Sequence, residues 1–223
     1  MDGLIVDIWR GKTMLRSLMN RRISRVGLYG DVIDIGGGFN PEYHNFFKKD
    51  PNKPAKFVVV DLKDSADKKI NLETDHLPFS DYSADYVLMF NLLEHVYNHM
   101  FVVSEAFRIL KSSGRLIGFV PFLVNYHPDP HDYFRYTKEA LMKIFSSAGF
   151  SEINIEEIGR GPFAVNYNNL VLSMPRFLRV LLLPFHYLLD SIMLGLRPKI
   201  GERYPLGYFF EARVIKVFRD RLN

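Results

Sequence analysis

Three consecutive glycines, Gly36 to Gly38, follow a short β-branched run and constrain the fold more than any other stretch. Residues 31–35 predict a buried strand that carries Asp34. Pro41 comes soon after the glycines, and proline suits the first turn of a helix because its missing N–H has no partner there. A strand, a glycine turn and a helix start bring the backbone close to a ligand at a strand's carboxyl end. We therefore expect an α/β protein that binds a ligand at this turn.

The spacing of the glycines and acids favours an adenosine-containing ligand that is not a dinucleotide. The dinucleotide pattern G-x-G-x-x-G needs a glycine at position 41, where this chain has Pro41, so a dehydrogenase is disfavoured. A second strand-like run, residues 56–61, ends on Asp61, which lies 27 residues after Asp34. This interval is about one β-α-β unit, and an acid at the end of the second strand can accept hydrogen bonds from both ribose hydroxyls.

A central segment carries a more specific pattern. Leu-Pro-Phe at 77–79 precedes a predicted buried strand at 85–90, and Leu-Glu-His at 93–95 follows it. Together with the glycine turn and the two acids, this order and spacing resembles the class I S-adenosylmethionine (SAM)-dependent methyltransferases over roughly residues 30–150. Asn40 stands where that family usually has its third glycine.

The resemblance implies an α/β fold with a Rossmann-like, seven-stranded, mostly parallel sheet and helices on both faces. We expect a single domain over residues 1–223, with an N-terminal helical cap at 1–30 that covers a sheet edge or forms a flap over the cofactor. An apolar helical insertion at 159–208, read as two short helices, precedes the last strand. The expected strands are 31–35, 56–61, 69–72, 85–90, 115–120, 150–158 and 208–218, and the expected helices are 41–49, 97–112 and 137–148.

Composition excludes several classes of protein. The chain has no cysteine, which excludes disulfides, thiolate metal sites and cysteine nucleophiles. The net charge of +4 comes from scattered Lys and Arg, so we expect no nucleic-acid partner. The N-terminus lacks the basic and apolar regions of a signal peptide, and we expect a cytoplasmic protein.

Prolines and charges interrupt the apolar stretch at 170–196, which predicts a lid, a dimer face or peripheral contact with the inner face of the membrane rather than a spanning helix.

The resemblance also implies SAM as the cofactor and assigns residues to it. The glycine turn would pass under the methionine part, near Asp34, while Asp61 would bind the ribose hydroxyls and Leu62 would pack on the adenine. Glu73, where the family usually has Asp, and Thr74 would read the adenine edge. The implied cofactor-binding residues are Asp34, Gly36, Gly37, Gly38, Asp61, Leu62, Glu73, Thr74 and Asn91.

The acceptor side is predicted from the loop at 127–137, HPDPHDYFRYT, which follows the fifth strand. His131 or His127 is the candidate general base, and Asp132 is its candidate orienting partner. Alternatively, the loop is only structural and Asp132 pairs with Arg135. The candidate substrate-binding residues are His95, Arg135 and Tyr136. We expect no metal, because His127, His131 and Asp129 or Asp132 show no recognised ligand spacing.

The HDYFRYT part of this loop resembles a methyltransferase subset found in glycan and polysaccharide biosynthesis. The sequence therefore predicts methyl transfer to a small or lipid-linked acceptor, at a hydroxyl of a sugar or glycan intermediate. A quinone or other lipid ring is an alternative acceptor. A methyltransferase-like binding protein without catalysis is an alternative of another class, disfavoured by the intact glycine turn and acids.

Overall fold

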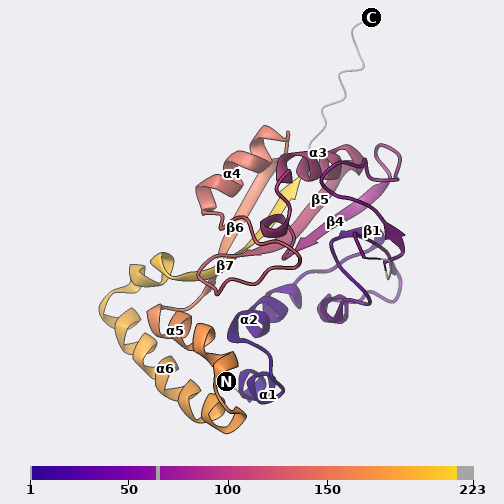
Figure 1. Ribbon diagram of the computed structural model, residues 1–223. Helices are drawn as coiled ribbons and strands as arrows, with labels where there is room; N and C mark the ends of the chain where they lie inside the picture. Colours follow the sequence, from indigo (N-terminus) through magenta and orange to yellow (C-terminus); the bar gives the residue numbers. More distant parts are fainter. Residues whose placement is uncertain (1, 64–65, 215–223) are drawn as a thin grey trace, which may run out of the picture.

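The structure, a computed structural model, describes residues 2–63 and 66–214 of the chain (Figure 1). Its centre is one seven-stranded sheet with the strand order β3-β2-β1-β4-β5-β7-β6. Only β7 runs antiparallel to its neighbours within the described residues. This architecture confirms the predicted Rossmann-like sheet. The strands are β1 (Gly30–Ile35), β2 (Ala55–Asp61), β3 (Lys68–Lys69), β4 (Ala84–Phe90), β5 (Leu110–Pro121), β6 (Ser151–Gly159) and β7 (Pro205–Arg213).

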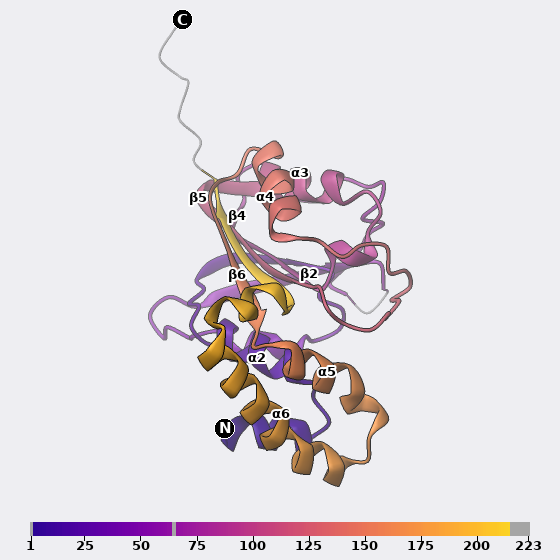
Figure 2. The ribbon, with the colours of Figure 1, turned by 90° about the vertical axis from the view of Figure 1, so that its left-hand side faces the viewer.

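Helices cover both faces of the sheet (Figures 1 and 2). One face packs against α3 (His99–Ile109) and α4 (Lys138–Ser147), and the other against α2 (Met14–Ile23) and the 3-10 turn η1 (Glu42–Phe46). Three further helices pack together beside α2 and form a separate helical layer. These are α1 (Asp2–Trp9), α5 (Pro162–Leu170) and α6 (Arg176–Leu196), and the remaining short turns are η2 (Leu93–His95), η3 (Val171–Ser173) and η4 (Pro198–Arg203).

The central strands are buried on both faces, which explains their nearly continuous apolar sequences. In β4, Val87 and Met89 face α3 and α4, whereas Leu88 and Phe90 face α2 and η1. All four side chains are almost completely buried. Because successive side chains of a strand point to opposite faces, one strand supplies both cores, and its carboxyl end is held rigidly.

The segment after the glycine turn differs from the predicted helix at 41–49. It contains only η1, and the backbone of Asn40 has a positive φ of 46° while Pro41 remains extended. The physical reason is the buried carboxylate of Asp34, which binds the side chains of both Tyr43 and His44. These two contacts fold the segment back under β1, so that the N-terminal helix α2 covers this face of the sheet instead.

The sequence predicts two short helices in the apolar insertion, and the structure differs from this prediction. The structure has α5, η3 and then α6, a continuous helix of 21 residues with Pro184 inside it. Burial of Leu183 and Asp190 on α6 holds the helix on both sides of that proline. The N-terminal lead forms two helices rather than one, with Gly11 at a φ of 92° in the turn between them.

Other boundaries shift by a few residues. The predicted helix at 97–112 ends at Ile109, because Leu110 already pairs with Ala84 on the neighbouring strand. The third strand is confined to Lys68–Lys69. The predicted cap of α4 is confirmed, since the Thr137 hydroxyl accepts a hydrogen bond from the Ala140 N–H. The last strand begins at Pro205, and positions 215–218 of its prediction lie outside the described residues.

A buried carboxylate on α3 anchors the Leu-Pro-Phe segment that leads into β4. Glu105 is only 5% exposed, and it accepts hydrogen bonds from the Leu77 N–H and from two nitrogens of Arg108, each at 2.8 Å. The Arg108 guanidinium in turn donates to the carbonyls of Leu77 and Phe79. The bound guanidinium lowers the pKa of Glu105 from 4.5 to about 2.

This ion pair predicts part of the acid sensitivity of the fold. A carboxyl whose pKa is lowered on folding stabilises the protein above its unfolded pKa, and this stability is lost as the pH falls from about 4.5 to about 2. The loss is at most about 3 kcal/mol. We expect Glu105→Gln to destabilise the protein at pH 7 by about 1–3 kcal/mol and to flatten the pH dependence of the unfolding free energy in that window. Denaturant unfolding at several pH values measures both effects.

Glu152→Gln is the matched control, because Glu152 forms an exposed ion pair with Arg213. Its unfolding free energy should stay within about 0.5 kcal/mol of the wild type. An unchanged acid profile in Glu105→Gln would contradict the role given to this carboxylate.

Candidate functional site

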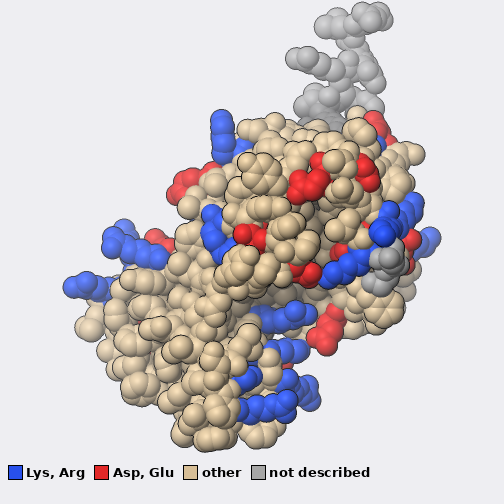
Figure 3. All heavy atoms as spheres, viewed as in Figure 1, with Lys and Arg blue, Asp and Glu red and all other residues tan. Residues whose placement is uncertain are grey.

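A cavity of about 1320 Å³ lies at the carboxyl ends of the parallel strands. Its walls come from the glycine turn, the ends of β2 and β4, the loop after β5, α2 and the segment from α5 to η3. Figure 3 shows the surface hollowed between the sheet part of the molecule and the helical layer, with basic side chains at the border. Ligand sites of single small molecules usually measure roughly 300–1,000 Å³, so this cavity has room for two ligands side by side.

The glycine turn lies on one wall as the sequence predicts. Gly36 and Gly38 have φ values of 77° and 67°, and a Cβ on Gly36 would lie 2.5 Å from Leu92. The Gly38 N–H donates to Asp61 Oδ2 at 2.9 Å, and the Lys63 N–H donates to the other oxygen at 3.0 Å. Asp61 is thus oriented at the wall by two backbone donors, which fixes the position of the carboxylate for a ligand.

Asp34 lies beneath the turn instead of on the cavity wall. Its side chain is fully buried, and a Cβ on Gly37 would come within 2.5 Å of Oδ2. This oxygen accepts a hydrogen bond from the Tyr43 hydroxyl at 2.5 Å and contacts His44 Nε2 at 2.6 Å. Burial, with the adjacent carboxylate, raises the pKa of Tyr43. Asp34 Oδ1 is buried without a hydrogen-bond partner and remains available to a donor under the turn.

The other predicted cofactor residues divide into those on the wall and those away from it. Leu62, Glu73 and Asn91 line the cavity, whereas Thr74 does not and donates its hydroxyl to Asp75. The Glu73 carboxylate accepts hydrogen bonds from two successive backbone N–H groups, of Tyr97 at 2.7 Å and of Asn98 at 2.8 Å. Glu73 therefore fixes the segment that leads into α3.

The loop after β5 brings His127, His131 and Tyr133 to the wall opposite the glycine turn. Asp132 accepts hydrogen bonds from two nitrogens of Arg135 and from the His127 N–H, and none from His131. The Arg135 guanidinium holds the pKa of Asp132 well below its usual range. The sequence analysis gave an Asp132–Arg135 pair as the alternative in which the loop is only structural, and the structure contains this pair. The pair holds the loop in its conformation.

Of the three predicted substrate-binding residues, one lines the cavity and two do not. Arg135 does not line the cavity and donates also to the Phe134 and Asn125 carbonyls. Tyr136 is buried away from the wall, and its hydroxyl donates to the Leu93 carbonyl at 2.9 Å. Burial raises the pKa of Tyr136. His95 does line the cavity, beside the loop histidines.

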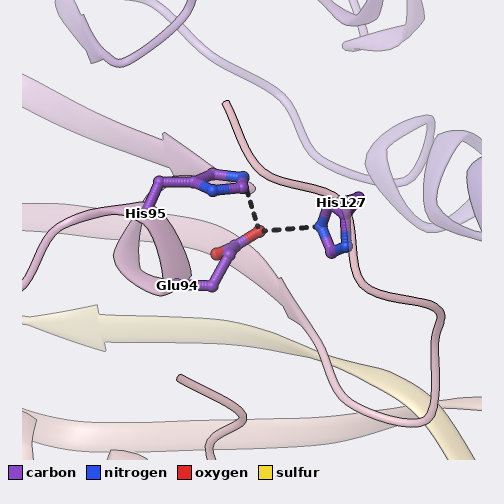
Figure 4. A group of neighbouring side chains, drawn as sticks. All are labelled: Glu94, His95 and His127. Carbon is purple, nitrogen blue, oxygen red and sulfur yellow. Dashed lines mark ion pairs between the residues drawn. The ribbon is translucent and has the colours of Figure 1, made fainter. Parts of the chain in front are cut away.

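A buried acid that the sequence analysis did not select lies behind this wall. Glu94 is fully buried, and its Oε1 faces His95 Nε2 at 3.7 Å and His127 Nε2 at 3.9 Å (Figure 4). The carboxylate raises the pKa of His127. The Leu-Glu-His motif contained the signal for Glu94, because an acid in an apolar motif at a strand end is a candidate site residue.

Comparisons with known proteins find a matching family model and one curated relative. Residues 35–118 match the family model described as a methyltransferase domain. A curated relative, an uncharacterized protein of Methanocaldococcus jannaschii, is 31% identical over 156 residues, which are 67% of this chain and 61% of that protein.

Solved structures share the fold at low sequence identity. A SAM-dependent methyltransferase from Archaeoglobus fulgidus is 17% identical with a TM-score of 0.59, covering 93% of this chain and 96% of that one. Phosphoethanolamine N-methyltransferase 2 of Haemonchus contortus, in complex with SAM, is 16% identical with a TM-score of 0.56, covering 89% of this chain and 52% of that one. The chain thus spans about three fifths of the curated relative and about half of this enzyme. Residues 35–118 thus match a methyltransferase domain, and the solved structures share the fold over most of this chain.

The close approach of Gly37 to Asp34 generates a prediction for the turn. Gly37→Ala places a Cβ 2.5 Å from Asp34 Oδ2 and 3.1 Å from Val59, so the turn must shift. We expect destabilisation of about 1–3 kcal/mol and at least tenfold weaker SAM binding. Thermal unfolding and calorimetric titration measure the two effects. Gly195→Ala is the control, because nothing lies within 4 Å of its added Cβ on α6 and a helical alanine is favourable by about 0.5–1 kcal/mol. Equal effects of both variants would contradict the prediction.

Proposed function

We propose that this chain, which carries a methyltransferase domain, transfers the methyl group of SAM to a hydroxyl of a small or lipid-linked acceptor, a sugar or glycan intermediate. The observation that carries the proposal is the two-sided cavity. A glycine turn with an oriented Asp61 forms one wall, and a histidine-rich loop with His127 and His131 forms the other. Such a cavity can hold a cofactor and an acceptor in contact.

The cofactor side is proposed from the groups on the first wall. The Asp61 carboxylate accepts the ribose hydroxyls, and the half-exposed Leu62 packs on the adenine. Asp34, which is buried under the turn with its Oδ1 unpaired, lies near the methionine amino group and attracts its positive charge. Asn91, with its backbone at a φ of 50°, borders the sulfonium side.

The acceptor side is proposed from the second wall. SAM supplies a methyl carbon on a good leaving group, so the protein mainly aligns the acceptor oxygen with that carbon. As the new C–O bond forms, the C–S bond breaks and its electron pair stays on sulfur. His131, which is exposed at the wall, takes the hydroxyl proton. The Tyr133 ring lies beside this histidine in a tilted arrangement, with ring centroids 5.2 Å apart, and offers a surface for a sugar ring.

A lipid-linked acceptor is favoured by the outer face of α6, which Figure 2 shows along the outside of the helical layer. Its exposed apolar residues recur every three or four positions and so form one stripe. By length and composition α6 is long and apolar enough to cross a membrane, judged over the described residues. The stripe residues are Phe177, Leu181, Phe185, Leu188, Ile192 and Leu196.

The inner face of α6 favours lying on a membrane over crossing it. Asp190 is fully buried and accepts hydrogen bonds from the Phe163 and Ala164 N–H groups at the start of α5. Exposing this carboxylate to lipid would cost several kcal/mol. Exposed Arg176 and Arg197 lie at the two ends of α6, where they can meet anionic headgroups. We propose a cytoplasmic enzyme whose α6 lies in the membrane interface.

The cofactor assignment predicts the effect of Asp61→Ala. This change removes the carboxylate proposed to bind the ribose, and we expect at least 100-fold weaker binding of SAM in calorimetric titration. Two charge-assisted hydrogen bonds are worth about 3 kcal/mol or more, which corresponds to that factor. Asp31→Asn at the opposite end of the sheet is the control and should bind as the wild type. Absence of SAM binding to the folded wild type would refute the proposed function.

The interfacial role predicts selective loss of vesicle binding. We expect the double change Leu181→Ser and Phe185→Ser to weaken binding to vesicles of phosphatidylcholine with one quarter phosphatidylglycerol by at least tenfold in a sedimentation assay. Met142→Ser on α4 also removes an exposed apolar side chain and should have no effect. A dimer in light scattering that the double change dissociates, without vesicle binding, would overturn the membrane assignment.

A further inference from the structure

Glu94, His95 and His127 converge although they come from two separate segments. Glu94 and His95 lie on η2, directly after β4, and His127 lies on the loop after β5. Because β4 and β5 are parallel neighbours, their carboxyl ends meet at the same edge of the sheet. One ligand atom of each side chain lies within 4.8 Å of the other two. Figure 4 shows the three side chains pointing toward one another.

The shortest contacts of the two imidazoles indicate which nitrogen carries the proton. His95 Nδ1 lies 2.5 Å from the His131 carbonyl oxygen, and His127 Nδ1 lies 2.8 Å from the Asn125 carbonyl oxygen. A carbonyl oxygen only accepts, so these two contacts favour an N–H at each Nδ1, and the donor-only guanidinium of Arg135 lies farther from His127 Nδ1, at 3.3 Å. In the neutral imidazole the lone pair is then on Nε2, and both Nε2 atoms face Glu94. A histidine tied to a carbonyl in this way has the usual orientation of a metal ligand.

Among the described residues, the Glu94 carboxylate faces the two imidazoles, which balance its charge only when one of them is protonated. Both of its oxygens are fully buried and have no hydrogen-bond partner in the described structure. The nearby Arg135 is engaged by Asp132, and the Tyr136 hydroxyl donates to a backbone carbonyl. Burying an unpaired carboxylate costs several kcal/mol. A divalent cation between the carboxylate and the two Nε2 lone pairs would offset this cost.

We propose that Glu94, His95 and His127 bind a divalent transition-metal cation of the Zn²⁺ or Mn²⁺ class. Two histidines and one carboxylate with an open position are a ligand set of catalytic metal sites. Ligands of a tetrahedral Zn²⁺ site are roughly 3.4 Å apart for bonds of about 2.1 Å, close to the 3.7 Å and 3.9 Å between the carboxylate oxygen and the two nitrogens. His95 and His127 line the cavity, so the open position faces the acceptor side.

The role of the cation rests on the proposed methyl transfer, whereas its binding does not. Bound to the open position, the acceptor hydroxyl oxygen becomes more acidic, because the cation stabilises the alkoxide. His131 would take the proton that the hydroxyl loses, and the oxygen would form the bond to the methyl carbon as the C–S bond of SAM breaks and its electron pair stays on sulfur. Two vicinal hydroxyls of a sugar would suit the site, since both can approach one cation.

Titration of the metal-free protein with ZnCl₂ and with MnCl₂, in the absence of SAM, tests the proposal. We expect one cation per chain and, with CoCl₂, a visible absorption band of the protein-bound ion. Glu94→Gln keeps the volume of the side chain but loses the charge, and His127→Ala removes a ligand. Each should weaken binding at least 100-fold and abolish the band.

His76→Ala is the matched control, because His76 is an exposed histidine that contacts Glu105 outside the cluster. It should bind the cation as the wild type does. SAM titration and thermal unfolding of Glu94→Gln show whether the variant is folded. If Glu94→Gln proves unfolded, His95→Ala takes its place in the comparison.

The outcomes separate this proposal from the proposed function. Cation binding without SAM binding supports the metal site and refutes the methyltransferase. SAM binding without Zn²⁺, Mn²⁺ or Co²⁺ binding overturns the metal site alone. Cation binding that persists in the folded Glu94 and His127 variants places the ion elsewhere and also overturns the metal site.

Discussion

The burial of Asp34 beneath the glycine turn is the interaction on which the cavity depends. A fully buried carboxylate needs donors, and the structure supplies Tyr43 and His44 from the next segment. These contacts shorten the expected helix to η1 and lay the chain under β1. The turn above can then reach Asp61 through the Gly38 N–H. One acid thereby fixes the shape of the cofactor wall.

Two acids also lie at the opposite wall. One accepts hydrogen bonds, and the other has no hydrogen-bond donor among the described residues. Asp132 is bound by Arg135 and by a backbone N–H, so its charge only shapes the loop. Glu94 has no donor and faces two imidazole nitrogens. Polar groups that cost stability without compensation are retained where they serve a ligand. The contrast between these two acids marks the functional part of the wall.

The sequence predicted the sheet well because glycines, prolines and apolar strands act locally. It also placed Asp61, Asn91, His127 and His131 on one cavity, since strand ends of a parallel sheet meet. It could not show that Arg135 binds Asp132 instead of facing the cavity, because that choice depends on loop geometry. Glu94 was missed although its motif was recognised, because its lack of a hydrogen-bond partner is visible only after the surrounding side chains are placed.

The position of β7 has a consequence for synthesis of the protein. This strand lies between β5 and β6 in the sheet, although it follows both in the sequence. During translation, β5 and β6 therefore expose unpaired edges while the helical insertion is made. Only when Pro205–Arg213 emerges from the ribosome can the gap close. The nascent chain is thus open to wrong strand pairing until late, and its folding is suited to a chaperone that protects sheet edges.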